Sequence, residues 1–112
     1  KAGETYWQAG LRELKEETGQ RPLEYWTVPS LNAFYEFQTD MIHHIPAFAA
    51  RLDPEAEVVL NEEHSEYKWV GIERVRELVP WPEQRRLMHL IYDILHANGI
   101  LIDWQLPQSW FR

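Results

Sequence analysis

Residues 3–19 read GETYWQAGLRELKEETG, and this stretch decides the fold. It predicts an amphipathic helix over residues 5–18. Thr5 and Gln8 have the spacing of a capping box, and Gly19 stands where a left-handed cap ends a helix. Apolar side chains recur at helical spacing, so one stripe of the helix should be buried, formed by Trp7, Leu11, Leu14 and Thr18.

A second face of the same helix carries three carboxylates, Glu13, Glu16 and Glu17. Like charges three and four positions apart repel one another, so a divalent cation is a natural compensating partner. Mg²⁺ prefers oxygen ligands and commonly combines a few carboxylates with substrate phosphates. Arg12 precedes the cluster and is suited to fix one carboxylate by a paired hydrogen bond. Charge spacing alone is more typical of a solvated helix face, for example on a protein-interaction domain, in which case no metal would bind.

The full stretch resembles the signature of the Nudix hydrolases, in which Arg-Glu, an aliphatic residue, Glu-Glu and Gly follow a glutamate at fixed distances. Glu4 stands eight positions before Arg12, as that signature requires. The remaining fixed positions match in type and spacing at Glu13, Leu14, Glu16, Glu17 and Gly19. Two positions depart from it: the opening glycine would precede Lys1, and Gln20 replaces an aliphatic residue, which affects packing more than chemistry.

The resemblance implies an α/β fold, a Nudix-type α/β/α sandwich with a mixed sheet, in one domain over residues 1–112. It implies Mg²⁺ or Mn²⁺ as the cofactor, held by Glu13, Glu16 and Glu17. Arg12 would orient a carboxylate, and Glu4 would have a structural role near the metal. Because the chain opens at the signature helix without a methionine, we expect the N-terminal strands of the fold to be missing from it.

A second motif, Glu62-Glu63-His64 followed by Tyr67-Lys68-Trp69, resembles a stretch of two Nudix groups. These are the dATP or dihydroneopterin triphosphate pyrophosphohydrolases and the diadenosine polyphosphate hydrolases. The resemblance assigns Glu63 as the general base, because a base has to reach the attacking water from a separate element. The alternative is that Glu62 and Glu63 are ordinary loop charges. His64 is expected to form loop hydrogen bonds, and either Tyr67 or Trp69 to be in the core.

The rest of the chain predicts extended segments over 24–28, 32–38, 42–52, 57–61 and 67–70. Helices are expected over 72–78 and over 82–97, the latter with Pro82 in its first turn and Gly99 after its end. His43 and His44 would point to opposite faces of a strand, so they should not share one site. Lys15 is expected in solvent, and core packing is the favoured role for the aromatic residues Trp26, Phe34, Tyr35 and Phe37.

Composition excludes several classes of protein. The net charge of −7 disfavours binding to nucleic acid polymers, which usually requires a basic surface. No apolar stretch is long enough to span a membrane, and the absence of cysteine fits a reducing, cytoplasmic location. The sequence therefore predicts a soluble enzyme acting on a small phosphorylated substrate, with a homodimer left open.

The function expected is Mg²⁺-dependent hydrolysis of a nucleoside triphosphate or a related pterin triphosphate, releasing pyrophosphate. Two alternatives remain open at the level of sequence. One is hydrolysis of dinucleoside polyphosphates, and the other is a Nudix domain that senses nucleotides without turnover.

Overall fold

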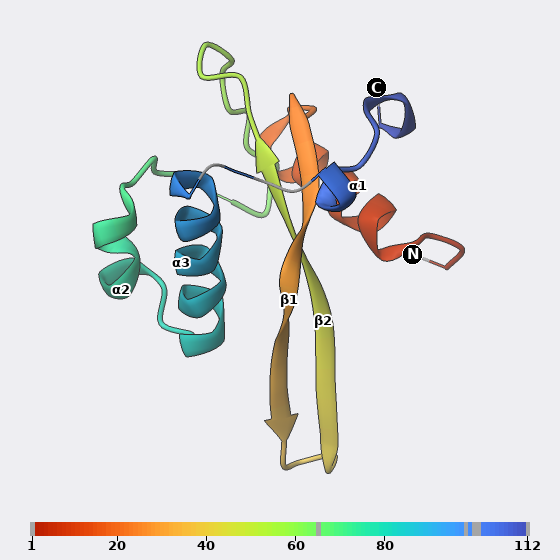
Figure 1. Cartoon of the computed structure of the whole chain (residues 1–112), viewed down its shortest axis with the longest axis vertical. Coiled ribbons are helices and arrows are strands. Elements are labelled where there is room, and N and C mark those ends of the chain that lie inside the picture. Colours follow the sequence, from red (N-terminus) through yellow and green to blue (C-terminus); the bar gives the residue numbers. More distant parts are fainter. Residues whose placement is uncertain (1, 65, 98, 100–101, 112) are drawn as a thin grey trace.

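The structure is a computed structural model that describes residues 2–64, 66–97, 99 and 102–111. A long β-hairpin stands at its centre, with helices on two sides (Figure 1). In chain order the elements are α1 (Tyr6–Thr18), β1 (Glu24–Glu36), β2 (Met41–Arg51), η1 (Ile72–Arg74), α2 (Val75–Leu78), α3 (Pro82–His96), η2 (Ile102–Trp104) and η3 (Gln108–Trp110). Helix α3 packs against β1, and α1 packs against β2.

The hairpin pairs β1 and β2 antiparallel from Glu24↔Arg51 to Glu36↔Met41. The register shifts between Thr27 and Leu31, around Pro29, which has no N–H to donate to the ladder. The two extended segments predicted before and after this proline are therefore one strand with an irregularity. At the tip of the hairpin Asp40 has a positive φ of 56°, a conformation that Asp tolerates better than most residues.

The α/β class expected from the sequence is confirmed, and the sheet consists of two antiparallel strands in the described part of the chain. Both long helices also match their predictions, α1 over its whole length and α3 to within one residue at its end. The predicted strands over 57–61 and 67–70 are wrong, because those segments have no regular structure. No helix of the described residues is both long and apolar enough to cross a membrane.

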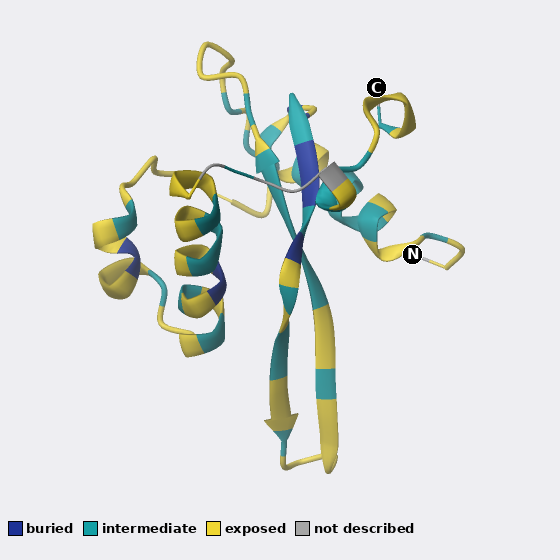
Figure 2. Cartoon of the chain, in the orientation of Figure 1, coloured by how far each residue is buried: buried dark blue, intermediate teal, exposed yellow. Residues whose placement is uncertain are grey.

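The buried side chains are few, and Figure 2 shows them on β1 and, apart from the hairpin, on α2 and α3. The buried hydrophobic residues are Tyr25, Trp26, Val28, Val75 and Leu87. The accessible surface is 8521 Å², against about 6,500 Å² for a compact monomer of this mass. The radius of gyration is 15.0 Å, against about 13 Å for a compact domain of 112 residues. The hairpin therefore projects from the core.

This projection corrects several burial predictions. Trp26 is in the core as expected, but the expectation was wrong for Phe34, Tyr35 and Phe37, which are 43%, 59% and 74% exposed. Tyr67 and Trp69 were expected to place at least one ring in the core, and they are 49% and 71% exposed. These rings stand on the outer half of the hairpin or in the long loop after β2, where packing against other elements leaves much of each ring exposed.

The C-terminal segment completes the packing around β1. Gln105 forms a bridge with Trp26, and the Leu106 N–H donates to the Tyr25 carbonyl at 2.9 Å. Beyond this bridge, Trp110 contacts Trp7 of α1 with ring centroids 5.6 Å apart. The tail thus joins the first helix to the hairpin.

Helix α1 begins and ends as its sequence predicts. Thr5 and Gln8 form both hydrogen bonds of the capping box, at 3.2 and 2.9 Å. Gly19 has a φ of 74°, and its N–H donates to the Lys15 carbonyl at 2.8 Å. The predicted stripe faces the protein, although its side chains are half-buried rather than buried. Gln20, at the position that departs from the signature, is 7% exposed, and its amide has no hydrogen-bond partner in the described structure.

Gly10 is the point of closest approach between α1 and the hairpin. A methyl group at this position would overlap the Tyr25 hydroxyl, which donates a hydrogen bond to the Trp7 carbonyl at 3.2 Å. Tyr25 is only 3% exposed and stacks on Phe48, so its ring has no room to move away. The absence of a side chain at Gly10 therefore allows the helix to rest on the sheet.

We expect Gly10→Ala to lower the free energy of unfolding by about 1–3 kcal/mol, the usual cost of overpacking. In a Tyr25→Phe background the new methyl would meet only ring carbons at 3.5–3.6 Å, an ordinary contact. There the same substitution should be neutral or stabilising by up to about 1 kcal/mol, since alanine favours helix. Urea unfolding of the four proteins measures both effects, and an equal loss in the two backgrounds would show that the hydroxyl contact is not the cause.

Candidate functional site

The candidate site is organised by the guanidinium of Arg12. Its Nε donates to both carboxylate oxygens of Glu4, at 3.1 and 3.0 Å, and its Nη1 donates to those of Glu16, at 3.3 and 3.2 Å. Its Nη2 lies 4.0 Å from Glu13 Oε1. The side chains of Arg12 and Glu4 are 25% and 22% exposed, so this pair is shielded more than an ordinary surface ion pair. Arg12 thus contacts carboxylates on both sides of its position in the helix.

These contacts shift the acid–base behaviour of the pair. Hydrogen bonding to Arg12 lowers the pKa of Glu4 from its ordinary value of 4.5. The same hydrogen bond to Glu4 raises the pKa of Arg12, with a smaller contribution from Glu16. Glu4 therefore stays ionised to a lower pH than an unpaired glutamate would, and remains a hydrogen-bond acceptor for Arg12.

The three predicted metal ligands lie on the solvent side of α1. The side chains of Glu13 and Glu16 are 62% and 51% exposed, and Glu17 is also exposed. Among the described residues, no group of three or more acidic, histidine or cysteine side chains converges on a point that would hold a metal ion. The donor set nevertheless fits Mg²⁺ chemically, because it consists of carboxylate oxygens on one face of one helix. Exposed glutamates can change rotamer without disturbing the core.

A hollow of about 540 Å³ opens beside Glu13, between α1 and β2. We call it the α1 hollow. Of the described residues that line it, Glu13 alone is charged. Its apolar wall comes from the hairpin and includes Tyr25, Ile45, Pro46, Phe48 and Ala50. Burial, and then the nearby Glu13 carboxylate, raise the pKa of the Tyr25 hydroxyl, so it stays a hydrogen-bond donor. One carboxylate of the signature thus faces a space large enough for part of a small ligand.

The sequence did not identify the hairpin residues of this hollow. Phe48 and Pro46 stand on a strand whose pairing partner and side of the sheet depend on long-range contacts. The only local signal was the apolar character of residues 42–52, which does not distinguish a core strand from the wall of a site.

The loop that carries Glu63 is attached to the end of α1. The Val59 N–H donates to the Thr18 carbonyl at 2.8 Å, one residue after Glu17. A methyl group at Gly19 would lie 3.1 Å from Val59 Cβ, so a larger residue there would press on this loop. Glu63 itself is exposed, and its N–H donates to Asn61 Oδ1 at 3.2 Å. The structure therefore brings the loop of Glu63 to the helix end that bears Glu16 and Glu17.

The other residues considered from the sequence lie apart from this site. His64 hydrogen-bonds Asn61 at 2.8 Å, as expected for a loop residue. His43 stacks on Phe34 and lies 3.6 Å from Glu36, whereas His44 is exposed, which agrees with a structural or surface role for both. Lys15 is exposed, as predicted.

Residues 1–91 match the family described as NUDIX domain. An octanoyltransferase of Myxococcus xanthus is 33% identical over 87 residues, which cover 71% of this chain and 23% of the relative. The chain thus spans about a quarter of the length of that protein. No solved structure matches the chain.

The Arg12 contacts predict a specific titration behaviour. In Arg12→Gln we expect the pKa of Glu4, followed by carboxyl NMR, to rise towards its ordinary value, because its charged partner is lost. Since the folded pKa is lowered, the pair stabilises the protein above about pH 4.5, and this stabilisation disappears as the pH falls through the lowered pKa. Arg74→Gln, which removes an exposed arginine on η1, is the control. An unchanged Glu4 pKa in Arg12→Gln would contradict the assignment.

Proposed function

Because the chain belongs to the NUDIX domain family, whose members are hydrolases of substrates built on a nucleoside diphosphate, we propose that it is a divalent-cation-dependent nucleotide pyrophosphohydrolase. Its substrate would be a nucleoside triphosphate or a related pterin triphosphate, and its products pyrophosphate and the monophosphate. The observation that supports this proposal most is the fixed geometry of the signature helix. Arg12 anchors it to Glu4, and Glu13, Glu16 and Glu17 stand on its accessible face.

The residues that would hold Mg²⁺ or Mn²⁺ are Glu13, Glu16 and Glu17. A bound divalent cation supplies positive charge to substrate phosphates and makes water a better nucleophile. The cation matters here because the chain itself has a net charge of −7 and the helix face is acidic, so a polyphosphate would otherwise be repelled.

The reaction proposed is an attack of water at one phosphorus atom. The water oxygen forms a new P–O bond, the P–O bond to the pyrophosphate leaving group breaks, and the water proton passes to Glu63. A carboxylate in a loop suits this role, because it can approach the water from outside the helix that binds the metal. The attachment of Val59 to Thr18 supports this assignment, since it fixes the loop beside the metal-binding helix.

Arg12 has a positioning role in this scheme. By holding Glu16 through both oxygens it restricts one ligand carboxylate before the metal binds, which lowers the entropic cost of assembling the site. Glu4 partly neutralises the charge of Arg12 and fixes the guanidinium through its Nε.

Replacement of one proposed ligand tests the metal site. We expect Glu17→Gln to retain its fold and to lose at least about 100-fold in turnover, because a neutral amide binds Mg²⁺ poorly. Pyrophosphate release is measured with Mg²⁺ for dATP and other nucleoside triphosphates, dihydroneopterin triphosphate and diadenosine tetraphosphate. The matched control is Glu77→Gln, an exposed glutamate on α2. Full activity of Glu17→Gln would exclude the proposed metal helix.

The substrate panel also separates the alternatives. Faster cleavage of diadenosine tetraphosphate than of any triphosphate would replace the proposed substrate by a dinucleoside polyphosphate. Nucleotide binding in the presence of Mg²⁺ without any product would instead identify a sensing domain.

The proposed base is tested by its pH dependence. Glu63→Gln should lower kcat by about 10²–10⁴-fold and remove the acidic limb of the pH–rate profile, while Mg²⁺ affinity changes little. Glu62→Gln, the neighbouring loop carboxylate, is the control and should behave like the parent. If Glu62→Gln shows the loss and Glu63→Gln does not, the base is assigned to the wrong carboxylate; if neither does, both glutamates are loop charges.

A further inference from the structure

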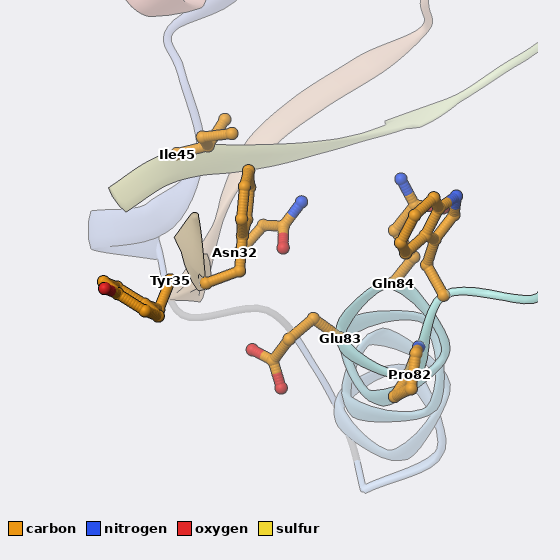
Figure 3. A pocket seen from close by; sticks show the side chains of 8 residues that line it. Asn32, Tyr35, Ile45, Pro82, Glu83 and Gln84 are labelled. Atoms are coloured by element: carbon orange, nitrogen blue, oxygen red, sulfur yellow. The ribbon is translucent and has the colours of Figure 1, made fainter. Parts of the chain in front are cut away.

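A second hollow, of about 560 Å³, lies between the outer half of the hairpin and the first turn of α3. We call it the aromatic hollow. Figure 3 shows Asn32 and Ile45 on the hairpin side, Pro82 and Gln84 on the helix side, and the Glu83 carboxylate reaching into the space between them. Two large rings, Phe34 and Trp81, also line it.

The two walls of this hollow are tied together by Arg86. Its guanidinium donates to the Leu31 carbonyl at 3.0 Å, to Ser30 Oγ at 3.2 Å, and to both oxygens of Glu83 at 3.0 Å. The hairpin and α3 are therefore held at a fixed separation, and the hollow is preformed rather than a gap between independent elements.

The lining has the chemistry that recognises a flat heteroaromatic ring. Phe34 is 43% exposed and has one ring face covered by His43, with centroids 4.8 Å apart, and Trp81 is 67% exposed. Aromatic side chains displayed in a hollow offer stacking surfaces for a nucleobase or a similar ring. The amides of Asn32 and Gln84 also line the hollow, and each carries both donors and an acceptor that can meet the edge of such a ring.

Glu83 restricts which rings fit. Hydrogen bonding from Arg86 lowers the pKa of Glu83, so the group is an ionised carboxylate that only accepts hydrogen bonds. A ligand edge facing it must therefore supply N–H groups. Fused rings with an amino group, such as purines and pterins, meet this condition.

The aromatic hollow lies on the α3 side of the hairpin and the α1 hollow on its α1 side, and of the described lining residues they share Ile45, which is 42% exposed on the outer edge of β2. Glu13 faces the α1 hollow, so the two spaces offer an aromatic compartment and an acidic, cation-binding compartment on either side of one residue. A ligand with a ring at one end and phosphates at the other would reach both hollows by passing around the edge of β2 at Ile45.

We propose that the aromatic hollow binds the heteroaromatic ring of the substrate, an amino-bearing purine or pterin, while its phosphates extend past Ile45 towards Glu13. This inference rests on the proposed hydrolysis for the identity of the phosphate end. The ring site itself has a separate test, because a compound without phosphate should bind it without any metal.

The experiment compares Trp81→Ala with Trp69→Ala, which removes an equally exposed tryptophan outside this hollow. Binding of deoxyadenosine, deoxyguanosine and dihydroneopterin is measured by saturation-transfer NMR and by calorimetry without divalent cation. We expect at least one ring compound to bind the parent and Trp69→Ala, and Trp81→Ala to weaken that binding by about 5- to 150-fold. On the substrate that turns over, Trp81→Ala should raise KM by a similar factor with kcat little changed.

Asn32→Leu supplies a second variant that keeps the volume of the side chain and removes its polar edge. It should change the preference among the three rings without abolishing stacking.

Equal binding by Trp81→Ala and Trp69→Ala, or no ring binding by the parent, would overturn the ring site. Trp81-dependent ring binding together with unaltered turnover in Glu17→Gln would leave the ring site standing and overturn the proposed metal-dependent hydrolysis. Loss of turnover in Glu17→Gln with an unchanged KM in Trp81→Ala would support the metal-dependent hydrolysis and overturn the ring site.

Discussion

The bridge from Glu4 through Arg12 to Glu16 is the interaction on which the candidate site depends. One guanidinium offers separate N–H groups to two carboxylates, and it does so from the middle of a helix whose N-terminus is capped by Thr5. A lysine would provide a single point charge and could not hold both partners in a fixed plane. The bridge leaves Glu13 and Glu17 accessible to solvent on the same helix. One helix therefore carries both a fixed ion-pair bridge and carboxylates that a ligand can reach.

A helix with several glutamates on one face also needs a firm position on the protein, and packing supplies it. Gly10 lets α1 approach Tyr25 closely, and the Tyr25 hydroxyl returns a hydrogen bond to the Trp7 carbonyl. At the other end, Gly19 turns the chain and makes room for Val59. The two glycines thus set the distances from the carboxylates to the hairpin wall and to the loop of Glu63.

Sequence reasoning succeeded where local interactions decide the structure. The capping box, the left-handed Gly19 and the two long helices depend on residues within a few positions of one another, and each was predicted. It failed for residues 57–61 and 67–70, where strand formation requires a pairing partner elsewhere in the chain. The exposure of Phe34 and Tyr35 was missed for the same reason: alternation shows that a strand is apolar, but not what covers it.

The aromatic rings of the outer hairpin are exposed because their burial depends on other elements of the chain lying over the strands. A two-stranded ribbon has two faces and little core of its own, so its apolar side chains are covered only where a helix lies against them. Helix α3 contacts only part of the length of the hairpin. Arg86 fixes it there by donating hydrogen bonds to the Leu31 carbonyl of the hairpin and to the Glu83 carboxylate of the helix. Below the buried residues this leaves a space with aromatic walls rather than a filled core. A chain that needed only stability would gain by closing this space with apolar side chains. Here the amides of Asn32 and Gln84 and the Glu83 carboxylate line it instead, a combination that favours recognition of a polar ring over packing.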